Sequence, residues 1–313
     1  MTRFETPRVA IVGAGQIGRG WAALAIAAGW PVTIYDADSE MLTPAADAIG
    51  DRVLALVRHK RAEGHVAEDA LNLMRVGRSL LQAVESADWI IESVPEDLAV
   101  KQKALQLIEQ VARRAAIITS SASNLSPSLL ASRLERADRF LVAHPLHPVE
   151  LVPLVELVPG PHTDPACTED IRFWLSLLGR SAVVLRKEVP GHIAGRLSAA
   201  LWRECIQMVL DGVLDVEDID RAVSIGPALA WATSGVHLSQ HLTSGNANIE
   251  LFLDQMLNDQ EEVWKTLADW KKLEPEDQKK LLRLLDKAYT QHLHGLRDAR
   301  DHRLVRLLDA MRE

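Results

Sequence analysis

Residues 8–36 read RVAIVGAGQIGRGWAALAIAAGWPVTIYD, and this stretch decides the fold. Its apolar run at 9–12 is short and bounded by glycine, which is typical of a strand buried on both faces. Three glycines in the spacing G-x-G-x-x-G come next, followed by an alanine-rich segment of high helix propensity. A second apolar run, 32–35, ends on Asp36. This order of strand, turn, helix and strand is the context in which the glycine spacing predicts a dinucleotide site.

Each glycine of this turn has a separate physical task. Gly13 permits the tight turn, Gly15 lets the backbone approach a pyrophosphate, and Gly18 lets the helix pack closely on the strand. The first helical turn, with Gln16 and Ile17, offers unpaired N–H groups and the positive end of the helix dipole to the phosphates. We therefore expect Gly13, Gly15, Gln16, Ile17 and Gly18 to bind the cofactor.

Asp36 indicates which dinucleotide is bound. It lies eighteen residues after Gly18, where a carboxylate accepts hydrogen bonds from the adenosine ribose hydroxyls. The same charge would repel the additional phosphate of NADP, so NAD is the expected cofactor. The alternative is a glycine-rich turn in an α/β protein that binds no nucleotide.

Composition limits the classes of protein to be considered. The chain has 313 residues, of which 48% are hydrophobic and 25% charged, as in soluble globular proteins. A net charge of −8 argues against nucleic acid as a main partner. Cys167 and Cys205 have no metal-binding spacing, and no secretory signal or bilayer-spanning run is present. A cytoplasmic protein without nucleic-acid or membrane partners is predicted.

Strands that alternate with helices predict a parallel sheet covered on both faces. The fold class is therefore α/β, a Rossmann-type doubly wound sheet, followed by an all-helical C-terminal domain. The expected helices of the sheet domain include 39–61, a surface excursion at 63–70 and one that begins at 95–97. The further strands are expected at 87–94, 116–119, 140–143, 154–158 and 182–185.

The pattern changes near Pro190, where helices replace strands. Helices are expected at 193–210 and 216–223, with a charged, periodic tail at 274–313. We therefore predict an NAD-binding domain at 1–189 and a helical substrate and dimerisation domain at 190–313.

Polar side chains follow the apolar strands at their carboxyl ends, where parallel sheets bind ligands. Gly13, Glu96 and Ser123 are expected around one crevice, with His144 on a loop after the strand at 140–143. Glu156 lies in an otherwise apolar strand, where a carboxylate is costly unless it is paired.

Three stretches make the chain resemble the 3-hydroxyacyl-CoA dehydrogenase family over nearly its full length: VPEDLAVK at 94–101, SASNL at 121–125 and HPLHPVELVPLVEL at 144–157. The phrases ALWRE, IGPALAWA and RDARDHRLVRLLDAM are similar to the branch of that family that oxidises short substrates such as gulonate or carnitine. The resemblance implies a homodimer built by the helical domain, and a place for Glu96 and Lys101 near the nicotinamide ribose. From their own positions these two residues indicate only a helix-start acid and a solvated lysine.

The chemistry of alcohol oxidation assigns further roles. Removing the hydroxyl proton needs a base, and histidine at His144 suits that task. Glu156, twelve residues on, can return beside it on the next strand and fix the imidazole. Ser123 would bond the substrate hydroxyl or carbonyl oxygen, or else cap a helix. His144, Glu156 and Ser123 are the predicted catalytic residues, unless His144 is an ordinary loop histidine and Glu156 reaches solvent.

Two departures from the family bear on the substrate. His147 stands where acyl-CoA members carry an asparagine three residues after the histidine, and Gly195 replaces a second asparagine before Arg196. A smaller, more polar 3-hydroxy acid than acyl-CoA is therefore expected. Arg196 or Arg203 would meet its carboxylate, unless both form surface ion pairs.

Two tryptophans are candidates for the rest of the substrate pocket. Trp202 and Trp231 would form an aromatic wall or a cage for a quaternary ammonium group, with core or dimer-interface packing as the alternative. His237 and His241 have the i, i+4 spacing of metal ligands, but no carboxylate accompanies them and no metal is predicted.

Other oxidoreductases fit the sequence less well. Neither tyrosine, Tyr35 or Tyr289, precedes a lysine at the Tyr-x-x-x-Lys spacing that short-chain dehydrogenases need. No lysine lies at 192–212, where β-hydroxyacid dehydrogenases carry their base. A non-catalytic NAD(H)-binding protein of the crystallin kind and a 3-hydroxyacyl-CoA dehydrogenase stay as alternatives.

Overall fold

The computed structural model describes residues 6–59, 72–243, 249–290 and 293–311. The chain divides into two compact units, Met1–Arg196 and Leu197–Glu313. The helical excursion expected at 63–70 lies outside the described residues.

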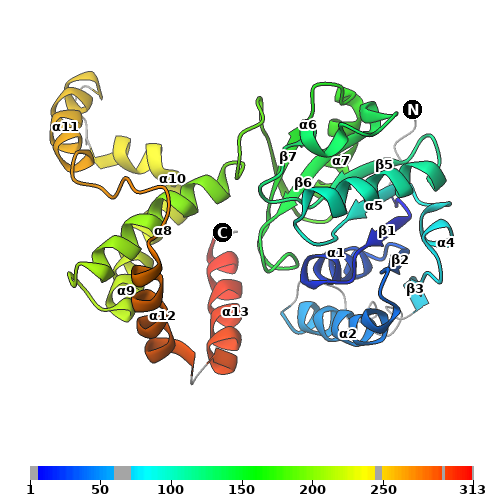
Figure 1. Cartoon of the computed structure of the whole chain (residues 1–313), viewed down its shortest axis with the longest axis horizontal. Coiled ribbons are helices and arrows are strands. Elements are labelled where there is room, and N and C mark those ends of the chain that lie inside the picture. The colour runs from blue at the N-terminus through cyan, green and yellow to red at the C-terminus, as the bar shows by residue number, and fades with distance from the viewer. Residues whose placement is uncertain (1–5, 60–71, 244–248, 291–292, 312–313) are drawn as a thin grey trace. The chain divides into compact units, whose positions relative to one another are not determined.

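The first unit contains an eight-stranded sheet in the order β3-β2-β1-β4-β5-β6-β7-β8 (Figure 1). Its first six strands in this order are all parallel. The chain therefore forms the Rossmann-type fold that the sequence predicts. The strands are β1 (Val9–Val12), β2 (Val32–Tyr35), β3 (Met74–Val76), β4 (Trp89–Glu92), β5 (Ile117–Ser120), β6 (Phe140–Pro145), β7 (Leu154–Pro159) and β8 (Ser181–Val184).

The prediction of a wholly parallel sheet is wrong at one edge. Strand β7 runs antiparallel to β6, and β8 is parallel to β7. The cause is the connection of eight residues, 146–153, between β6 and β7, which is too short for a parallel crossover. His144 also lies within β6 and not on the loop that the sequence suggested.

Helices cover both faces of the sheet and produce two separate apolar cores. Because successive strand residues point to opposite faces, Val9 and Ile11 of β1 join the core under α1, α2 and α7. Ala10 and Val12 join the core under α4, α5 and α6. The helices are α1 (Gln16–Ala27), α2 (Leu42–Arg58), α4 (Leu80–Val84), α5 (Leu98–Val111), α6 (Pro127–Ala131) and α7 (Pro165–Leu177), with 3-10 turns η1 (Ser39–Met41) and η2 (Ala137–Arg139).

Strand β3 and helix α7 were not foreseen. The run of β3 is only three residues long and mostly exposed, so it carries little apolar signal. For α7 the sequence does hold a signal, since Asp164 caps the helix through Ala166 N–H and Pro165 occupies its first turn.

The described residues of the second unit form helices joined by turns and no strand, as the pattern after Pro190 predicts. Its small core joins Val209, Val216 and Ile219 to apolar side chains of α12. The helices are α8 (Ala194–Leu210), which begins in the first unit, α9 (Val216–Ile225), α10 (Pro227–Thr243), α11 (Ile249–Trp264), α12 (Pro275–Tyr289) and α13 (Leu293–Ala310).

Candidate functional site

The glycine-rich turn lies where the strand order reverses, between β1 and β4. Gly13 has φ +111°, and a Cβ there would lie 2.5 Å from the carbonyl oxygen of Ser93 at the end of β4. A Cβ on Gly18 would lie 1.9 Å from the carbonyl oxygen of Gly13. Nothing lies within 4 Å of the Cβ position of Gly15. The backbone is thus closed around Gly13 and Gly18 and open at Gly15, as an approaching pyrophosphate requires.

A cavity of about 460 Å³ adjoins this turn. Asp36 lies in its lining, with apolar side chains of α5 opposite. The Asp36 carboxylate accepts the N–H groups of Ala14 at 2.7 Å and Asp38 at 3.0 Å, which fixes it beside the turn. A carboxylate, an apolar slot and a turn with three glycines fit the adenosine and pyrophosphate of a dinucleotide.

Gln16 and Ile17 lie at the start of α1, as predicted. The side chain and the carbonyl of Gln16 both accept hydrogen bonds from Arg52 of α2. Arg52 also pairs with Glu150 at 3.1 Å, on the loop between β6 and β7. Ile17 is partly buried against the core. The amino end of α1 is therefore tied to the loop that carries His147.

A buried ion pair supports the loop after β4. Lys101 is 1% exposed, and its ammonium donates to Glu92 at 2.9 Å and to the carbonyl of Val94 at 3.0 Å. It lies 3.5 Å from Glu96. The idea of a solvated Lys101 is therefore wrong, because the ammonium is enclosed by acceptors. Burial raises the pKa of Glu92 against the opposing effects of Lys101, Ser120 and the Val94 N–H.

Glu96 joins this loop to the one after β5. Its Oε1 accepts the N–H groups of Ser123 and Asn124, each at 2.9 Å. Burial acts to raise the pKa of Glu96, but these amides and the charge of Lys101 outweigh it and the pKa lies below its usual value. Ser123 is half-buried and receives a hydrogen bond from the Asn124 amide at 3.1 Å. The cap of α6 is Ser126 and not Ser123, so the hydroxyl of Ser123 is not used as a helix cap.

His144 and Glu156 stand directly opposite each other on antiparallel strands β6 and β7. Side chains of such a pair share one face of the sheet. Nδ1 of His144 lies 2.8 Å from Oε2 of Glu156. Because a carboxylate only accepts, Nδ1 carries the hydrogen and Nε2 carries the lone pair. In the described part of the chain Nε2 has no hydrogen-bond partner, and the side chain is 14% exposed.

Glu156 is fully buried and is satisfied by three donors. Besides His144, the N–H groups of Ile193 and Ala194 each donate to its Oε1 at 2.8 Å. Burial acts to raise the pKa of Glu156, but these hydrogen bonds outweigh it and hold the pKa below the usual value. The carboxylate that the sequence marked as costly is therefore paired, and the alternative in which it reaches solvent is wrong.

The two amides and His192 are the parts of this site that sequence reasoning missed. His192 is 1% exposed, and its ring centroid lies 5.4 Å from that of His144. Backbone N–H groups leave no trace in a residue pattern. The Pro190-Gly191 pair before His192 was the available signal, because it marks a turn at the start of a helix.

The predicted substrate residues of the first unit lie next to the turn at Pro190 and Gly191 or on the loop after β6. His147 is exposed and precedes a cis bond to Pro148. Gly195 has open space at its Cβ position. Arg196 is exposed, and its guanidinium lies 3.4 Å from the Pro190 carbonyl.

Three predicted residues belong to the helical unit. Trp202 is 63% exposed and lines a surface pocket with Asp220 and Ile225. Arg203 donates to the carbonyl of Trp270 at 3.5 Å, and Trp231 is half-buried on α10. Their relation to His144 stays a prediction.

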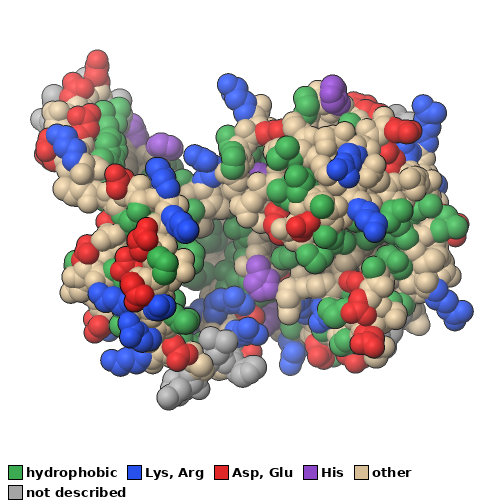
Figure 2. Space-filling view, viewed as in Figure 1, with side chains coloured by type: hydrophobic (Ala, Val, Ile, Leu, Met, Phe, Trp, Pro, Cys, Tyr) green, Lys and Arg blue, Asp and Glu red, His purple; other side chains and the backbone are tan. Residues whose placement is uncertain are grey.

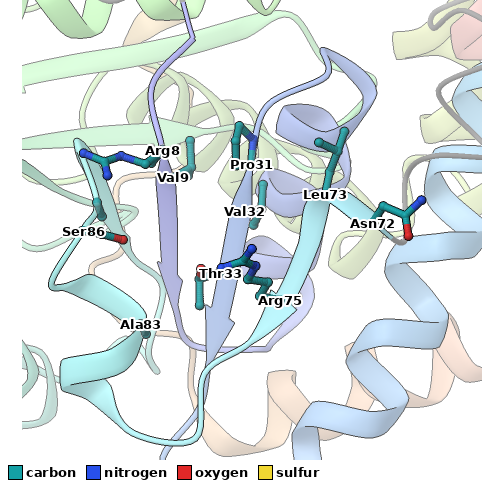
Figure 3. A pocket seen from close by; sticks show the side chains of 11 residues that line it. Arg8, Val9, Pro31, Val32, Thr33, Asn72, Leu73, Arg75, Ala83 and Ser86 are labelled. Carbon is teal, nitrogen blue, oxygen red and sulfur yellow. The ribbon is translucent and has the colours of Figure 1, made fainter.

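Two other features have residue types or a cavity of the kind found in binding sites. His237 and His241 both follow a kink at Gly235 within α10, and no group of three or more metal-ligating side chains occurs among the described residues. A pocket of about 320 Å³ lies at the amino ends of β1, β2 and β3, lined by Arg8, Pro31 and Arg75 among others (Figure 3). Ligands in such sheets bind at the opposite, carboxyl ends.

No described helix combines the length and apolar character needed to cross a bilayer.

Comparison with protein families identifies both parts of the chain. A model of the 3-hydroxyacyl-CoA dehydrogenase NAD binding domain matches residues 8–189, and that of the 3-hydroxyacyl-CoA dehydrogenase C-terminal domain matches 191–283. An L-carnitine dehydrogenase of Bacillus cereus is 36% identical over 255 residues, covering 82% of this chain and 77% of that protein. One of Streptomyces griseus is 33% identical over 310 residues, covering 99% of this chain and 88% of that protein.

Solved structures agree in fold. An NAD⁺-dependent dismutase named FHMPC 5-dehydrogenase superposes with a TM-score of 0.83 at 23% identity, covering 98% of this chain and 99% of that one. M. tuberculosis FadB2 gives a TM-score of 0.66 at 29% identity, covering 71% of this chain and 78% of that one.

The lowered pKa of Glu156 predicts a pH-dependent contribution to stability. Its folded-state pKa lies below the unfolded value of 4.5, so the contribution is present above that pH and is lost as the pH falls through the folded value. We expect Glu156→Gln to lower the free energy of unfolding by about 2 kcal/mol at pH 7. The difference from wild type should shrink below pH 4.5.

Urea unfolding followed by tryptophan fluorescence measures both effects. Glu40→Gln, at an exposed position on η1, is the matched control and should change stability at neither pH. If the difference in unfolding free energy between Glu156→Gln and wild type stays constant across the acid range, the lowered pKa of Glu156 is contradicted.

Proposed function

The chain belongs to the 3-hydroxyacyl-CoA dehydrogenase family and is an NAD-dependent oxidoreductase; on that premise we propose that it oxidises the 3-hydroxyl of a short, polar 3-hydroxy acid to the 3-keto acid. Gulonate and carnitine represent the substrate class. The observation that carries the proposal is the fixed tautomer of His144, whose Nδ1–H is held by Glu156 while Nε2 is left without a partner in the described chain.

His144 acts as the base. Its Nε2 lone pair takes the proton of the 3-hydroxyl, and the carboxylate 2.8 Å from Nδ1 stabilises the imidazolium that forms. NAD⁺, which the glycine turn and Asp36 would hold, would supply the hydride acceptor for C3. The two Glu156 contacts with backbone amides keep the carboxylate ionised and prevent it from rotating away from the ring.

Ser123 orients the reacting oxygen. Its hydroxyl lies on a loop whose N–H groups are held by Glu96, and Glu96 is in turn next to the buried ammonium of Lys101. This arrangement supports roles for Glu96 and Lys101 in placing the nicotinamide end of the cofactor. Ser123 then donates to the substrate oxygen as the C–O bond gains carbonyl character.

The remaining residues select the substrate. The relatives named L-carnitine dehydrogenase support a zwitterionic 3-hydroxy acid, and the absence of both family asparagines at His147 and Gly195 counts against acyl-CoA. Arg196 or Arg203 would bind the carboxylate. Trp202 and Trp231 are the aromatic side chains available for a quaternary ammonium group.

A substrate panel distinguishes this activity from the two alternatives. Purified protein with NAD⁺ is offered L- and D-carnitine, L-gulonate, 3-hydroxybutyrate and 3-hydroxybutyryl-CoA, and nicotinamide absorbance is followed. Turnover of a free 3-hydroxy acid above the CoA ester is expected. Preference for the CoA ester would favour the acyl-CoA activity, and tight NAD binding without turnover would favour a crystallin-like role.

Removal of the base tests the dyad. His144→Ala should lower kcat by about a hundredfold or more, because general-base catalysis is lost. The dissociation constant for NAD⁺ should stay unchanged, since His144 does not line the nucleotide cavity. His162→Ala, at an exposed turn, is the control. A His144→Ala enzyme with unchanged kcat would refute the assignment.

Asp36 tests cofactor choice. Asp36→Ala should raise KM for NAD⁺ and narrow the preference over NADP⁺, because a ribose acceptor and a repelling charge are both removed. Steady-state kinetics with each cofactor measure this. Asp47→Ala, exposed on α2, should leave both values unchanged. An unaltered cofactor ratio in the Asp36 variant would remove Asp36 from the cofactor site.

We further propose residues 1–189 as the NAD-binding domain and 190–313 as a substrate and dimerisation domain, in a cytoplasmic homodimer. Supporting this, α11 exposes Leu253, Leu257 and Trp264, spaced by four and seven residues along one stripe. Figure 2 shows hydrophobic side chains at the surface of this helix. Both cysteines are free thiols, as suits a reducing compartment.

Mass measurement by light scattering tests the homodimer. Twice the chain mass of 34.6 kDa is expected. Leu253→Glu combined with Leu257→Glu should shift the protein toward the monomer, because two charges would be buried at the interface. Leu81→Glu, at an exposed position on α4, should not. A wild-type monomer would refute this part of the proposal.

A further inference from the structure

His192 has an unusual combination of burial, backbone conformation and bonding. Its φ is +49°, and among the described residues it is the one non-glycine residue with a positive φ. Such a backbone conformation is uncommon for a residue that carries a Cβ. Nε2 lies 3.1 Å from the carbonyl oxygen of Ala122. Nδ1 is buried without a hydrogen-bond partner in the described chain. An imidazole held in this way at a turn requires an explanation beyond packing.

The bonding fixes the position of the ring hydrogen. A carbonyl only accepts, so Nε2 carries the hydrogen and Nδ1 carries the lone pair of a neutral imidazole. A second proton would have to lie on Nδ1, where it would meet no acceptor. Burial lowers the pKa of His192, and the positive form of His144 acts in the same direction, while the Ala122 bond and the charges of Glu156 and Glu96 oppose it.

Residue 192 also connects two parts of the proposed site. Its side chain holds Ala122, the residue before Ser123. Its main chain leads directly into the N–H groups of Ile193 and Ala194, both 2.8 Å from Glu156. The left-handed backbone at 192 turns the chain so that these amides face the carboxylate. One residue therefore joins the Ser123 loop to the acid that orients His144.

We propose that His192 is a positioning residue, an imidazole whose Nε2–H holds the Ser123 loop and the Glu156–His144 pair in register. The proposal rests on the proposed dehydrogenase function for its catalytic meaning. Its structural content is independent of turnover. The N–H donated to Ala122 is the essential element, and the uncharged ring leaves His144 as the imidazole that gains a proton.

Two variants separate the donor from the ring. His192→Phe keeps an aromatic ring but leaves the buried Ala122 carbonyl without its donor. His192→Gln loses the ring but retains an amide N–H that reaches the position of Nε2. His162→Phe, at an exposed turn, is the matched control.

Kinetics give the first readout. In His192→Phe we expect kcat to fall by about tenfold or more through misplacement of Ser123 and Glu156, with NAD⁺ affinity retained. The midpoint of the acid limb of its kcat/KM profile should move, and His192→Gln should restore most of the lost kcat. Equal kcat and pH profiles in wild type and both variants, with only the unfolding midpoint lowered, would overturn the proposal in favour of simple packing.

Histidine-labelled protein gives a second readout that needs no substrate. Long-range ¹H–¹⁵N NMR spectra report the tautomer of each ring, with the His144 signals assigned by their loss in His144→Ala. We expect the Nδ1–H tautomer at His144 in wild type and in His192→Gln, and a mixture of tautomers in His192→Phe. If the wild type shows this spectral pattern but no turnover, the dehydrogenase function is refuted and the positioning role is retained. If the His144 tautomer is unchanged in His192→Phe, the positioning role is overturned.

Discussion

The hydrogen bond between the Glu156 carboxylate and Nδ1 of His144 is the contact on which the proposed site depends. It joins two strands that run antiparallel at the edge of an otherwise parallel sheet, and it places a charged group where no solvent reaches. A buried carboxylate is tolerated because three donors surround it. The same three bonds keep it ionised, and an ionised acceptor is what determines the tautomer of His144.

A second network fixes the loops after β4 and β5. The buried Glu92–Lys101 pair fixes the loop after β4. Glu96, on that loop, accepts hydrogen bonds from the N–H groups of Ser123 and Asn124 and so holds the loop after β5 as well. Such a pair contributes little net stability after desolvation, but removing one partner leaves an uncompensated charge. Its value here lies in geometry, because it holds the loops on both sides of β4 and β5 at the carboxyl ends of the strands.

The two networks meet at the turn before α8. The amides that donate to the Glu156 carboxylate belong to Ile193 and Ala194. The preceding His192 donates to the carbonyl of Ala122, the residue before Ser123. The amino end of a long helix therefore directs N–H groups at a carboxylate, an arrangement that the helix dipole favours. The fold brings His192 to Ala122, which lies 70 residues before it in the sequence.

The sequence by itself determined the strand–turn–helix–strand unit that begins the sheet, since Gly13 and Gly18 meet local backbone requirements that a spacing records. It also indicated the pairing of His144 with Glu156, because a carboxylate in an apolar strand demands a partner. The tertiary structure decided that β7 runs antiparallel, that Lys101 is buried and that Ser126, not Ser123, caps α6. These outcomes depend on contacts between distant segments, and backbone amides and buried ion pairs have no periodicity by which a pattern of residues could reveal them.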